Sequence, residues 1–581
     1  MSPSTHETAA GPPDEGRLKT AFIVVTWTLI GLGLRIASIN TRGLWLDEAI
    51  TVKQASRTLL RVIQKLATGV HPPLYHITMH FWLKYFGKSE VALRSFSVII
   101  GVIAIPVAYW AGKRIYDRRT GLIAAALIAL SPFQIWYSQE ARMYTLLFLG
   151  GLLSTTFLVL AVRENRKHLW VGYLVFTTMG LFTHYFFLFL MVGQILVYVF
   201  GIVWITERDA RHAKTAQASW RNPRGLLADV PTLGPWLMVS LAMALFVGFW
   251  LANSIFVPAE NGPNALVGSV AGSGLGYGQE APHLALRFND VAIVVTQMTV
   301  GFHSPVVMAA FVSLWPTLIY LVFILMGLIR PVRTWTWVLM LGASGILVMF
   351  LLGQWQGQIL ASRYFMAVAA PAFLLVARLL AKLERRHARP LFVVLIALSL
   401  VTWADQSYNP DNAMTHDDRA AFQTIVANYQ PGDAVIYVPF YLDPLAAYYL
   451  PTSIPQYGMP RYGQFDMLRN TQAEIDEDTA RIAASAQRVW VLLSFQDIDP
   501  VRNDSQAIRY WMKHNGYTVE KQTSLNQVEL MLYVPPEVVV PPSFFTPGAS
   551  TTATASTSPT APGAPTTPTA PVDATGTVIA P

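Results

Sequence analysis

Apolar stretches long enough to cross a lipid bilayer recur throughout the first 404 residues of the chain. A transmembrane helix needs about 20 mostly apolar residues, and lipid-exposed backbone must satisfy its hydrogen bonds internally. The sequence therefore predicts a mainly α polytopic membrane protein with about eleven transmembrane helices. The expected spans lie at roughly 19–38, 91–112, 120–138, 143–162, 168–184, 185–205, 234–256, 305–329, 334–353, 364–382 and 389–404.

The composition of the chain excludes several kinds of binding site. Charged residues make up only 13% of the chain, and there is no cysteine, so disulfides and thiolate metal sites are excluded. A net charge of +8 could suggest nucleic acid in a soluble protein. Here the basic residues lie mostly in loops between apolar segments, which is the pattern of a membrane topology signal. We therefore expect a lipid bilayer and no nucleic acid as partner.

The loop charges predict an orientation. Basic clusters occur within 113–119, 163–167, 208–224, 330–333 and 382–389, and all of these loops share one side if the N-terminus is cytoplasmic. The opposite, outer side then receives the loop 39–90, the turn 131–144, the loop 257–304, the pair Arg363-Tyr364 and everything after about residue 405. This arrangement predicts a multi-pass protein of the plasma membrane with an extracytoplasmic C-terminal part.

The chain divides into four segments by composition. Residues 1–18 form a polar N-terminal tail, and 19–404 form the transmembrane part. Within it, the outer loop 39–90 carries an amphipathic pattern from Ala55 to Leu66 that is typical of an interfacial helix. The loop 257–304 begins with a stretch rich in Gly, Ser and Asn that predicts a flexible lid over an outer cavity. Residues 405–540 are expected to form an α/β domain, and 541–581 a disordered tail rich in Pro, Thr and Ala.

Within the α/β domain, individual elements are predicted from local patterns. A helix is expected over 417–428, followed by the turn Pro431-Gly432-Asp433 and a strand over 434–438. Further strands are expected at 488–493, 517–520 and 528–533, with a helix over 506–513 between the first two. Strands that alternate with helices in this way predict a small α/β fold.

Polar residues in costly positions are the candidates for function. Asp47 and Glu48 follow the first span, where two adjacent carboxylates are expensive to desolvate; ordinary loop charges are an equally simple interpretation. Glu140 and Arg142 interrupt an apolar stretch, although a structural pair that closes a turn would look the same. Arg363 begins a late span, where it would either extend to the interface or hold a lipid phosphate.

Several motifs taken together resemble a known family. They are Trp45-Leu46-Asp47-Glu48-Ala49 after the first span, His71-Pro72-Pro73-Leu74-Tyr75 downstream, Ser138-Gln139-Glu140-Ala141-Arg142-Met143-Tyr144 after the third span, and Ser362-Arg363-Tyr364 before a late span. Their order is similar to that in GT-C class membrane glycosyltransferases. The resemblance is strongest to bacterial family-39-like proteins, which are relatives of protein mannosyltransferases and of the lipid A aminoarabinose transferase. It covers about residues 19–404, and the domain after 405 is also similar to this group.

The resemblance implies an inverting glycosyltransferase. One sugar would pass from a polyprenyl-phosphate donor to a protein, lipid or polysaccharide acceptor at the outer face of the membrane. Asp47 matches the family's catalytic acidic position, as general base, and Glu48 would share that role or orient the acceptor. Arg142 and Arg363 would hold the donor phosphate. The remaining candidates for substrate binding are His71, Tyr75, Glu140, Tyr144, His184 and Tyr364.

The resemblance also leaves room for a divalent metal, since some relatives bind one with a Glu and a His. His71, His76, His184 and Glu140 are the available ligands, but no spacing in the chain demands a metal, and none is predicted. Two other functions were weighed. A transporter would place charges along a path at mid-membrane and show repeated halves, whereas these charges gather at one face. A non-catalytic relative that recruits envelope components remains an alternative.

Overall fold

The computed structural model describes residues 13–67, 72–195, 198, 232–256, 362–409, 416–460, 472–496 and 499–536. The residues up to Pro536 belong to one compact unit. The predicted spans 305–329 and 334–353, the end of the predicted span 185–205, the lid loop 257–304, His71 and the tail 541–581 lie outside the described residues. The count of eleven spans and the segment boundaries therefore stay predictions.

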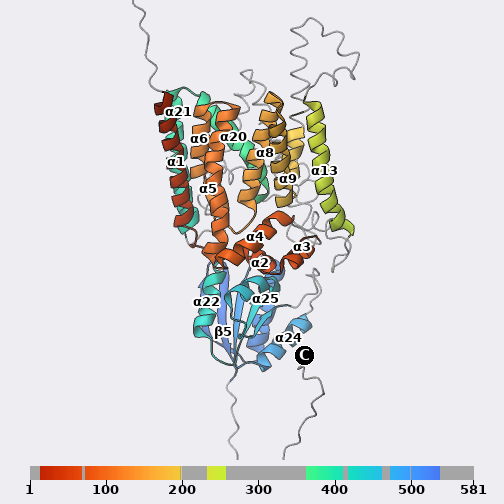
Figure 1. Cartoon of the computed structure of the whole chain (residues 1–581). Helices are drawn as coiled ribbons and strands as arrows, with labels where there is room; N and C mark the ends of the chain where they lie inside the picture. The colour runs from red at the N-terminus through yellow and green to blue at the C-terminus, as the bar shows by residue number, and fades with distance from the viewer. Residues whose placement is uncertain are drawn as a thin grey trace, which may run out of the picture. The chain divides into compact units, whose positions relative to one another are not determined.

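Long apolar helices form the membrane part. Among the described residues, five helices are long and apolar enough to cross a bilayer. They are α1 (Pro13–Ala37), α5 (Glu90–Ile115), α8 (Tyr144–Glu164), α20 (Met366–Lys382) and α21 (Arg385–Tyr408). The helices α9 (Lys167–Thr183) and α13 (Leu233–Phe256) stand beside them (Figure 1). The predicted mainly helical membrane protein is confirmed in this part.

The third predicted span is broken. It forms α6 (Arg118–Leu130) and α7 (Pro132–Ser138), whose axes are bent by 57°. Pro132 lacks a backbone N–H and forces the preceding Ser131 out of the helical conformation, so a continuous helix is not available here. The Ser131 hydroxyl instead accepts a hydrogen bond from the Gln134 N–H at 3.3 Å and caps α7. The bend places the turn 139–143 next to the first outer loop.

Close packing between helices uses small residues. At Gly112 of α5, a Cβ atom would lie only 2.8 Å from the backbone of Gly121 of α6. At Gly151 of α8, a Cβ would lie 2.5 Å from the carbonyl oxygen of Ala367 in α20. Small residues of this kind let the backbones of transmembrane helices approach closely. They fix α5, α6, α8 and α20 as one packed group, from which the outer loop and the turn 139–143 emerge.

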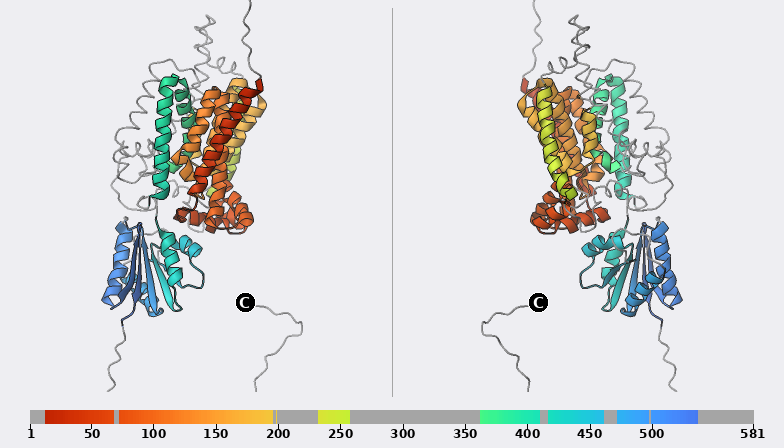
Figure 2. Two further views of the ribbon diagram at one scale, coloured as in Figure 1. Left: turned by 90° about the vertical axis from the view of Figure 1, so that its left-hand side faces the viewer. Right: turned by 90° about the vertical axis from the view of Figure 1, so that its right-hand side faces the viewer.

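Three short helices form a layer between the membrane helices and the C-terminal region (Figures 1 and 2). They are α2 (Leu46–Ala55), α3 (Leu59–Ala67) and α4 (Pro73–Phe86). The amphipathic helix expected over 55–66 is shifted, because α2 ends at Ala55 and α3 begins at Leu59. Val62 and Leu66 of α3 are buried while Leu60 is exposed, as an amphipathic helix requires.

The C-terminal region holds a five-stranded sheet in the order β2-β1-β3-β5-β4. Strand β1 pairs in parallel with β2 and β3, and β5 pairs antiparallel with β3 and β4. The strands are β1 (Asp433–Val438), β2 (Gln456–Gly458), β3 (Arg488–Ser494), β4 (Thr518–Leu525) and β5 (Val528–Val534). The helices are α22 (Asp418–Asn428), α23 (Asp443–Tyr449), α24 (Gln472–Ala484) and α25 (Asp499–His514).

Most of these C-terminal elements were predicted from the sequence. The structure confirms the strands at 434–438, 488–493 and 528–533 and the helix at 417–428 to within about one residue. The predicted strand 517–520 is longer and ends at Leu525, and the predicted helix 506–513 already begins at Asp499. The short strand β2 and the helices α23 and α24 were not predicted. Strand β1 and all but the first residue of β3 are buried, as expected for central strands covered on both faces.

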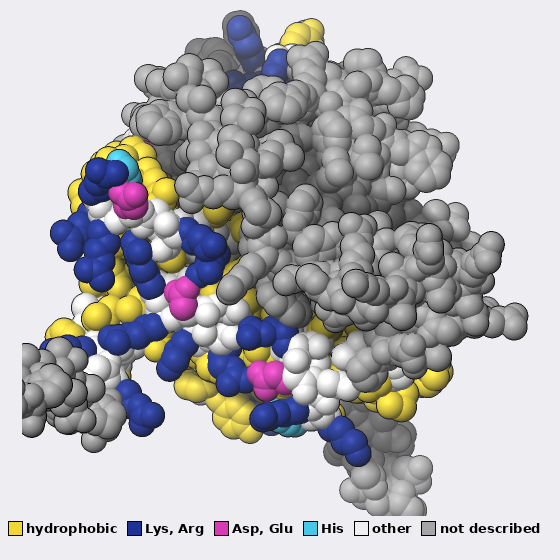
Figure 3. Space-filling model, turned by 90° about the horizontal axis from the view of Figure 1, so that it is seen from above, with side chains coloured by type: hydrophobic (Ala, Val, Ile, Leu, Met, Phe, Trp, Pro, Cys, Tyr) yellow, Lys and Arg dark blue, Asp and Glu magenta, His cyan; other side chains and the backbone are white. Residues whose placement is uncertain are grey.

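Basic residues mark the membrane face opposite the sheet. Lys and Arg side chains gather there, with few acidic ones among them (Figure 3). Lys113 and Arg114 lie in the last turn of α5, Arg163 in that of α8 and Lys382 in that of α20. Cations at helix C-termini also interact favourably with the helix dipole. The distribution agrees with the charge pattern of the sequence; the direction of the chain across the membrane remains a prediction.

A buried carboxyl group in α22 makes the stability of this region depend on pH. Asp418 is 2% exposed, and burial raises the pKa of its carboxyl group from 3.8 to about 7. Because the folded state binds this proton more tightly than the unfolded state, stability is greatest at low pH and falls as pH rises from about 4 to about 7. We expect Asp418→Asn to remove this fall. Amide hydrogen exchange of 418–428 and 488–494 between pH 5 and 8, corrected for intrinsic exchange rates, measures it; identical pH dependence in variant and wild type would contradict it.

Candidate active site

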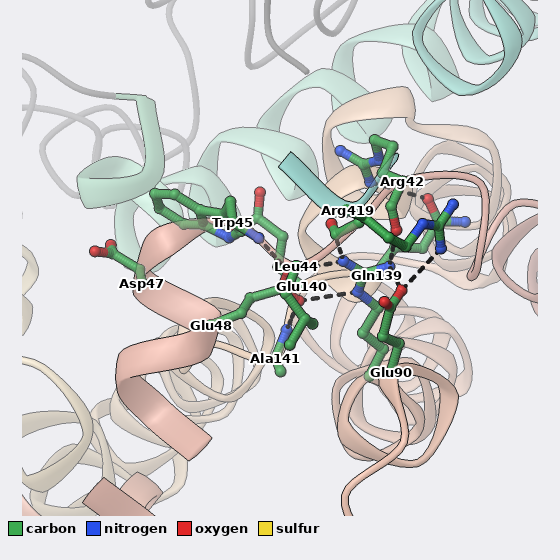
Figure 4. Close-up of polar contacts among 12 residues, drawn as sticks. Arg42, Leu44, Trp45, Asp47, Glu48, Glu90, Gln139, Glu140, Ala141 and Arg419 are labelled. Carbon is green, nitrogen blue, oxygen red and sulfur yellow. Dashed lines mark hydrogen bonds and ion pairs between the residues drawn. The ribbon is translucent and has the colours of Figure 1, made fainter. Parts of the chain in front are cut away.

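The two carboxylates of the first outer loop open helix α2 and point in different directions (Figure 4). Successive residues in a helix lie about 100° apart, so adjacent side chains cannot share one direction. Both carboxylates sit in the first turn, where the helix dipole favours negative charge. The environments that Asp47 and Glu48 meet are consequently different, although the sequence presents them as one pair.

Glu48 is held on all sides. Its side chain is fully buried and accepts two hydrogen bonds from the Arg94 guanidinium, at 2.9 Å from Nε and 2.7 Å from Nη2. The backbone N–H groups of Ala141 and Trp45 donate to the same carboxylate at 2.7 and 3.2 Å. With these partners in place, the geometry favours a positioning role for Glu48 over the expected share in proton transfer.

Arg94 organises the loop that carries the site. Beyond Glu48, its Nη atoms donate to the backbone carbonyls of Ile39, Arg42 and Gly43 at 2.7–2.9 Å. One guanidinium therefore ties the end of α1, the loop and the first turn of α2 to helix α5. Sequence analysis missed Arg94, although an arginine inside an apolar segment is itself a signal of a buried partner.

Asp47 remains accessible. Its side chain is 30% exposed, and one carboxylate oxygen lies 3.6 Å from Nη2 of Arg142, which is almost completely buried. Arg142 comes from the turn after α7, and its Nη1 also donates to the Thr51 hydroxyl of α2 at 3.1 Å. An accessible carboxylate fixed beside a buried guanidinium can receive a proton from a bound molecule without leaving its place.

A third segment completes this cluster. The short helix η1 (Ser362–Phe365) places the Arg363 guanidinium over the rings of Trp45 and Tyr364, with centroid distances of 5.6 and 5.2 Å. Arg363 also interacts electrostatically with Asp47 and Tyr144. The ring of Tyr364 in turn lies 5.8 Å from that of His184, at the end of α9. Residues from four distant segments thus meet around Asp47.

Glu140 lies at the edge of the same cluster. The Trp136 indole donates to one of its carboxylate oxygens at 2.7 Å, and the other oxygen is buried without a hydrogen bond among the described residues. Burial, reinforced by the charge of Glu48, raises the pKa of this carboxyl group to about 7, while Arg42 and Arg363 oppose the shift. The buried Glu140 carboxyl group therefore holds its proton more tightly than an exposed glutamate does.

Two tyrosines face the buried side of the site. Tyr75 of α4 is fully buried and interacts with Arg142, and Tyr144 begins α8 beside the same guanidinium, 6.0 Å from its ring centroid. His71 lies outside the described residues. Within the described ranges, no three His, Cys, Asp or Glu residues are grouped so that they could hold a metal ion. The described residues therefore do not test whether the protein binds a divalent metal.

The C-terminal region contacts the loop that carries Asp47 and Glu48 from the side opposite the membrane helices. The Tyr449 hydroxyl accepts the Leu44 N–H at 2.7 Å and donates to Glu90 at 2.7 Å. Arg419 of α22 lies 3.0 Å from the other oxygen of Glu90, and Glu90 lies 3.9 Å from Arg94 (Figure 4). We call Arg419, Tyr449 and Glu90 the latch. A chain of charges thus leads from the sheet region through Glu90 and Arg94 to Glu48, and no local sequence pattern predicts it.

Known proteins resemble this chain in sequence and in fold. Residues 70–215 match the family model described as dolichyl-phosphate-mannose-protein mannosyltransferase. Apo ArnT from Cupriavidus metallidurans superposes with a TM-score of 0.55 at 12% identity, over 88% of this chain and 97% of that one. ArnT bound to undecaprenyl phosphate covers the same shares, with a TM-score of 0.50 at 12% identity. No curated protein sequence matches.

The described helices and the superposition show that this chain shares the fold of ArnT. The resemblance that the sequence motifs indicated is confirmed. The family match covers about a quarter of the chain, and the structural likeness extends over most of it.

Removal of the Glu48 charge should destabilise the protein. Glu48→Gln would leave the buried Arg94 guanidinium with only the more distant Glu90 as an ion-pair partner, and loss of one partner of a buried pair costs about 3–5 kcal/mol. Thermal unfolding in detergent measures this cost. The matched control is Glu164→Gln, which breaks the more exposed Arg114–Glu164 pair and should change stability by less than about 1 kcal/mol. Equal small effects of the two variants would contradict the positioning role.

Loss of the latch should loosen the loop without unfolding the protein. Arg419→Met removes the ion pair with Glu90 and the hydrogen bonds to Asn40 and to the Thr41 carbonyl. We expect amide exchange across 40–48 to accelerate about tenfold, while exchange within the buried strand β3 stays unchanged. Arg509→Met, which breaks the Arg509–Glu529 pair of the sheet region, is the control. Unchanged exchange of 40–48 in Arg419→Met would show that the latch does not hold the loop.

Proposed function

We propose that this protein transfers a single sugar, with inversion, from a polyprenyl-phosphate donor to an acceptor hydroxyl at the outer face of the plasma membrane. The observation that carries the proposal is the accessible Asp47 carboxylate beside buried Arg142, next to a Glu48 that is fully engaged elsewhere. An arrangement with one free and one fixed carboxylate supplies a base at a defined position.

In the proposed reaction, Asp47 takes the proton of the acceptor hydroxyl as its oxygen attacks the anomeric carbon of the donor sugar. The bond between that carbon and the phosphate oxygen breaks, and the carrier phosphate leaves with the bonding electron pair. Attack from the side opposite the leaving phosphate inverts the anomeric centre. The proton remains on Asp47 until solvent removes it, so the carboxylate is regenerated for the next turnover.

Arg142 and Arg363 are proposed to hold the donor phosphate. Guanidinium groups bind phosphate in a bidentate manner, and the interaction strengthens as negative charge grows on the leaving group. Arg363 lies at the start of the span that continues into α20. Its guanidinium therefore sits at the membrane surface, where the phosphate of a lipid lies when the lipid chain stays in the bilayer. Among the described residues, its guanidinium contacts aromatic faces and forms no ion pair. The Tyr144 and Tyr364 hydroxyls are proposed as further ligands of phosphate or sugar.

The comparisons support the donor class. ArnT, whose fold this chain shares, has been crystallised with undecaprenyl phosphate, and the description of the matching family names dolichyl-phosphate-mannose. Both are lipid phosphates of the polyprenyl type. For this chain, the sugar is left open, and the acceptor belongs to the proteins, lipids or polysaccharides of the cell envelope. We propose 19–404 as the catalytic part and 405–540 as an extracytoplasmic domain that completes it.

Replacement of Asp47 tests the proposal. Asp47→Asn keeps the size of the side chain but removes the base, and we expect transfer to fall by about 100- to 10,000-fold. The assay uses purified protein in nanodiscs, radiolabelled polyprenyl-phosphate sugars from source-cell membranes, and envelope extract from cells that lack the protein. Asp476→Asn on helix α24 is the matched control. A folded Asp47→Asn protein with the wild-type rate would overturn the assignment.

A further inference from the structure

A cavity lies outside the cluster around Asp47, where helix α2 meets the ends of strands β1 and β2. It has a volume of about 570 Å³, and its walls include Lys53, Tyr437, Phe440, Asp443, Gln456 and Tyr457. Lys53 belongs to α2, whereas the other five belong to the C-terminal region. We call this cavity the α2–sheet pocket. The pocket exists only because helix α2 and the C-terminal region are in contact. Arg419 and Tyr449 of the latch join the C-terminal region to the loop before α2 and to Glu90.

The floor of the α2–sheet pocket is built to hold its polar groups in place. The Tyr437 hydroxyl donates to a carboxylate oxygen of Asp443 at 2.6 Å. Gly458 pairs with Tyr437 across the sheet, and a Cβ atom at this position would lie 2.7 Å from Asp443 Oδ1 and 2.9 Å from the Tyr437 ring. Glycine is therefore needed for this close approach. The carboxylate is fixed by a tyrosine that is itself part of the buried core, while the Asp443 residue stays exposed.

The residue types indicate the kind of ligand. Three aromatic side chains offer apolar surface, and a carboxylate, an amide and an ammonium group offer hydrogen bonds in the same small space. A sugar presents apolar C–H faces together with hydroxyl groups that both donate and accept hydrogen bonds. An acyl chain would gain nothing from Asp443, Gln456 and Lys53, and a phosphate would be repelled by the carboxylate. The lining therefore matches a neutral carbohydrate.

The pocket also lies at a useful distance from the proposed base. Lys53 and Asp47 are six residues apart on helix α2, which corresponds to about 9 Å along its axis. The same six residues turn the helix by about 600°, so the two side chains leave α2 about 120° apart. Only a glycan of several sugar residues that passes around the helix can therefore reach both positions. Because α2 is a single helix, the separation between base and pocket is fixed by its backbone.

We propose that the α2–sheet pocket binds hexose residues of a glycan acceptor whose reacting hydroxyl lies at Asp47. This assigns the acceptor to the carbohydrate class and gives the C-terminal region a direct part in acceptor recognition. The direction of the acceptor toward Asp47 rests on the proposed function, whereas binding of a sugar in the pocket does not. The two claims can therefore be tested separately.

The test measures binding without transfer. Full-length protein in nanodiscs, without donor, is mixed with methyl mannoside, mannobiose, mannotriose, mannotetraose and the corresponding glucose series, and binding is followed by saturation-transfer NMR. Lys53→Met and Asp443→Asn alter exposed side chains of the pocket, and Lys84→Met and Glu477→Gln are matched exposed controls. Asp47→Asn is included to separate binding from catalysis, and a Ser/Thr-rich peptide serves as the competing probe.

We expect the wild type to bind oligosaccharides of two or more residues more tightly than the single sugar. Asp443→Asn and Lys53→Met should weaken binding about tenfold, in line with the loss of a hydrogen bond to a charged group. The controls should bind like the wild type, and sugar binding by Asp47→Asn should still depend on Asp443 and Lys53. Absence of sugar binding, sugar binding unaffected by both pocket variants, or peptide binding that depends on Asp443 would overturn the proposal. Sugar binding in a protein that transfers no sugar would support the pocket and refute the proposed function alone.

Discussion

The buried ion pair between Glu48 and Arg94 is the interaction on which the rest of the site depends. Two charges withdrawn from water are stable together only when their geometry is good and their remaining hydrogen-bonding capacity is used. Both conditions are met, because Glu48 also accepts two backbone N–H groups and Arg94 also donates to three backbone carbonyls. The pair therefore fixes the loop after α1, the start of α2 and the turn after α7 as one unit.

This ion pair gives the two adjacent carboxylates, Asp47 and Glu48, different roles. Glu48 has a structural role, because it holds the start of helix α2 in place. The helix in turn directs Asp47 toward Arg142 and the partly exposed Arg363. The same anchoring extends outward through Glu90 to Arg419 and Tyr449 of the C-terminal region. The loop that carries Asp47 and the C-terminal region are thus joined by side chains as well as by the chain itself. We propose that the C-terminal region belongs to the site, since it steadies the loop and supplies most of the α2–sheet pocket.

Local patterns in the sequence were sufficient for the described membrane helices, for most strands, and for the gathering of Asp47, Glu140, Arg142 and Arg363, because charge bias places their loops on one face. Three kinds of feature could not be found this way. The break at Ser131-Pro132 was not predicted, because the apolar run continues across it and only the proline indicates that the helix ends there. Strand β2 has three residues and no pattern of its own. Arg94, the partner of Glu48, is 46 residues away in the sequence, and Arg419, the partner of Glu90, is 329 residues away. Local sequence patterns do not predict pairs at such separations.

The central claim is that Asp47 is the base and Glu48 its anchor. Chemical rescue tests it directly: the transfer rates of Asp47→Ala and Glu48→Ala are measured in nanodiscs with increasing formate, a small carboxylate that can replace a missing base but not a buried anchor. The account predicts that formate restores part of the rate of Asp47→Ala and none of the rate of Glu48→Ala. Rescue of Glu48→Ala alone, or a wild-type rate in Asp47→Ala without formate, would contradict it.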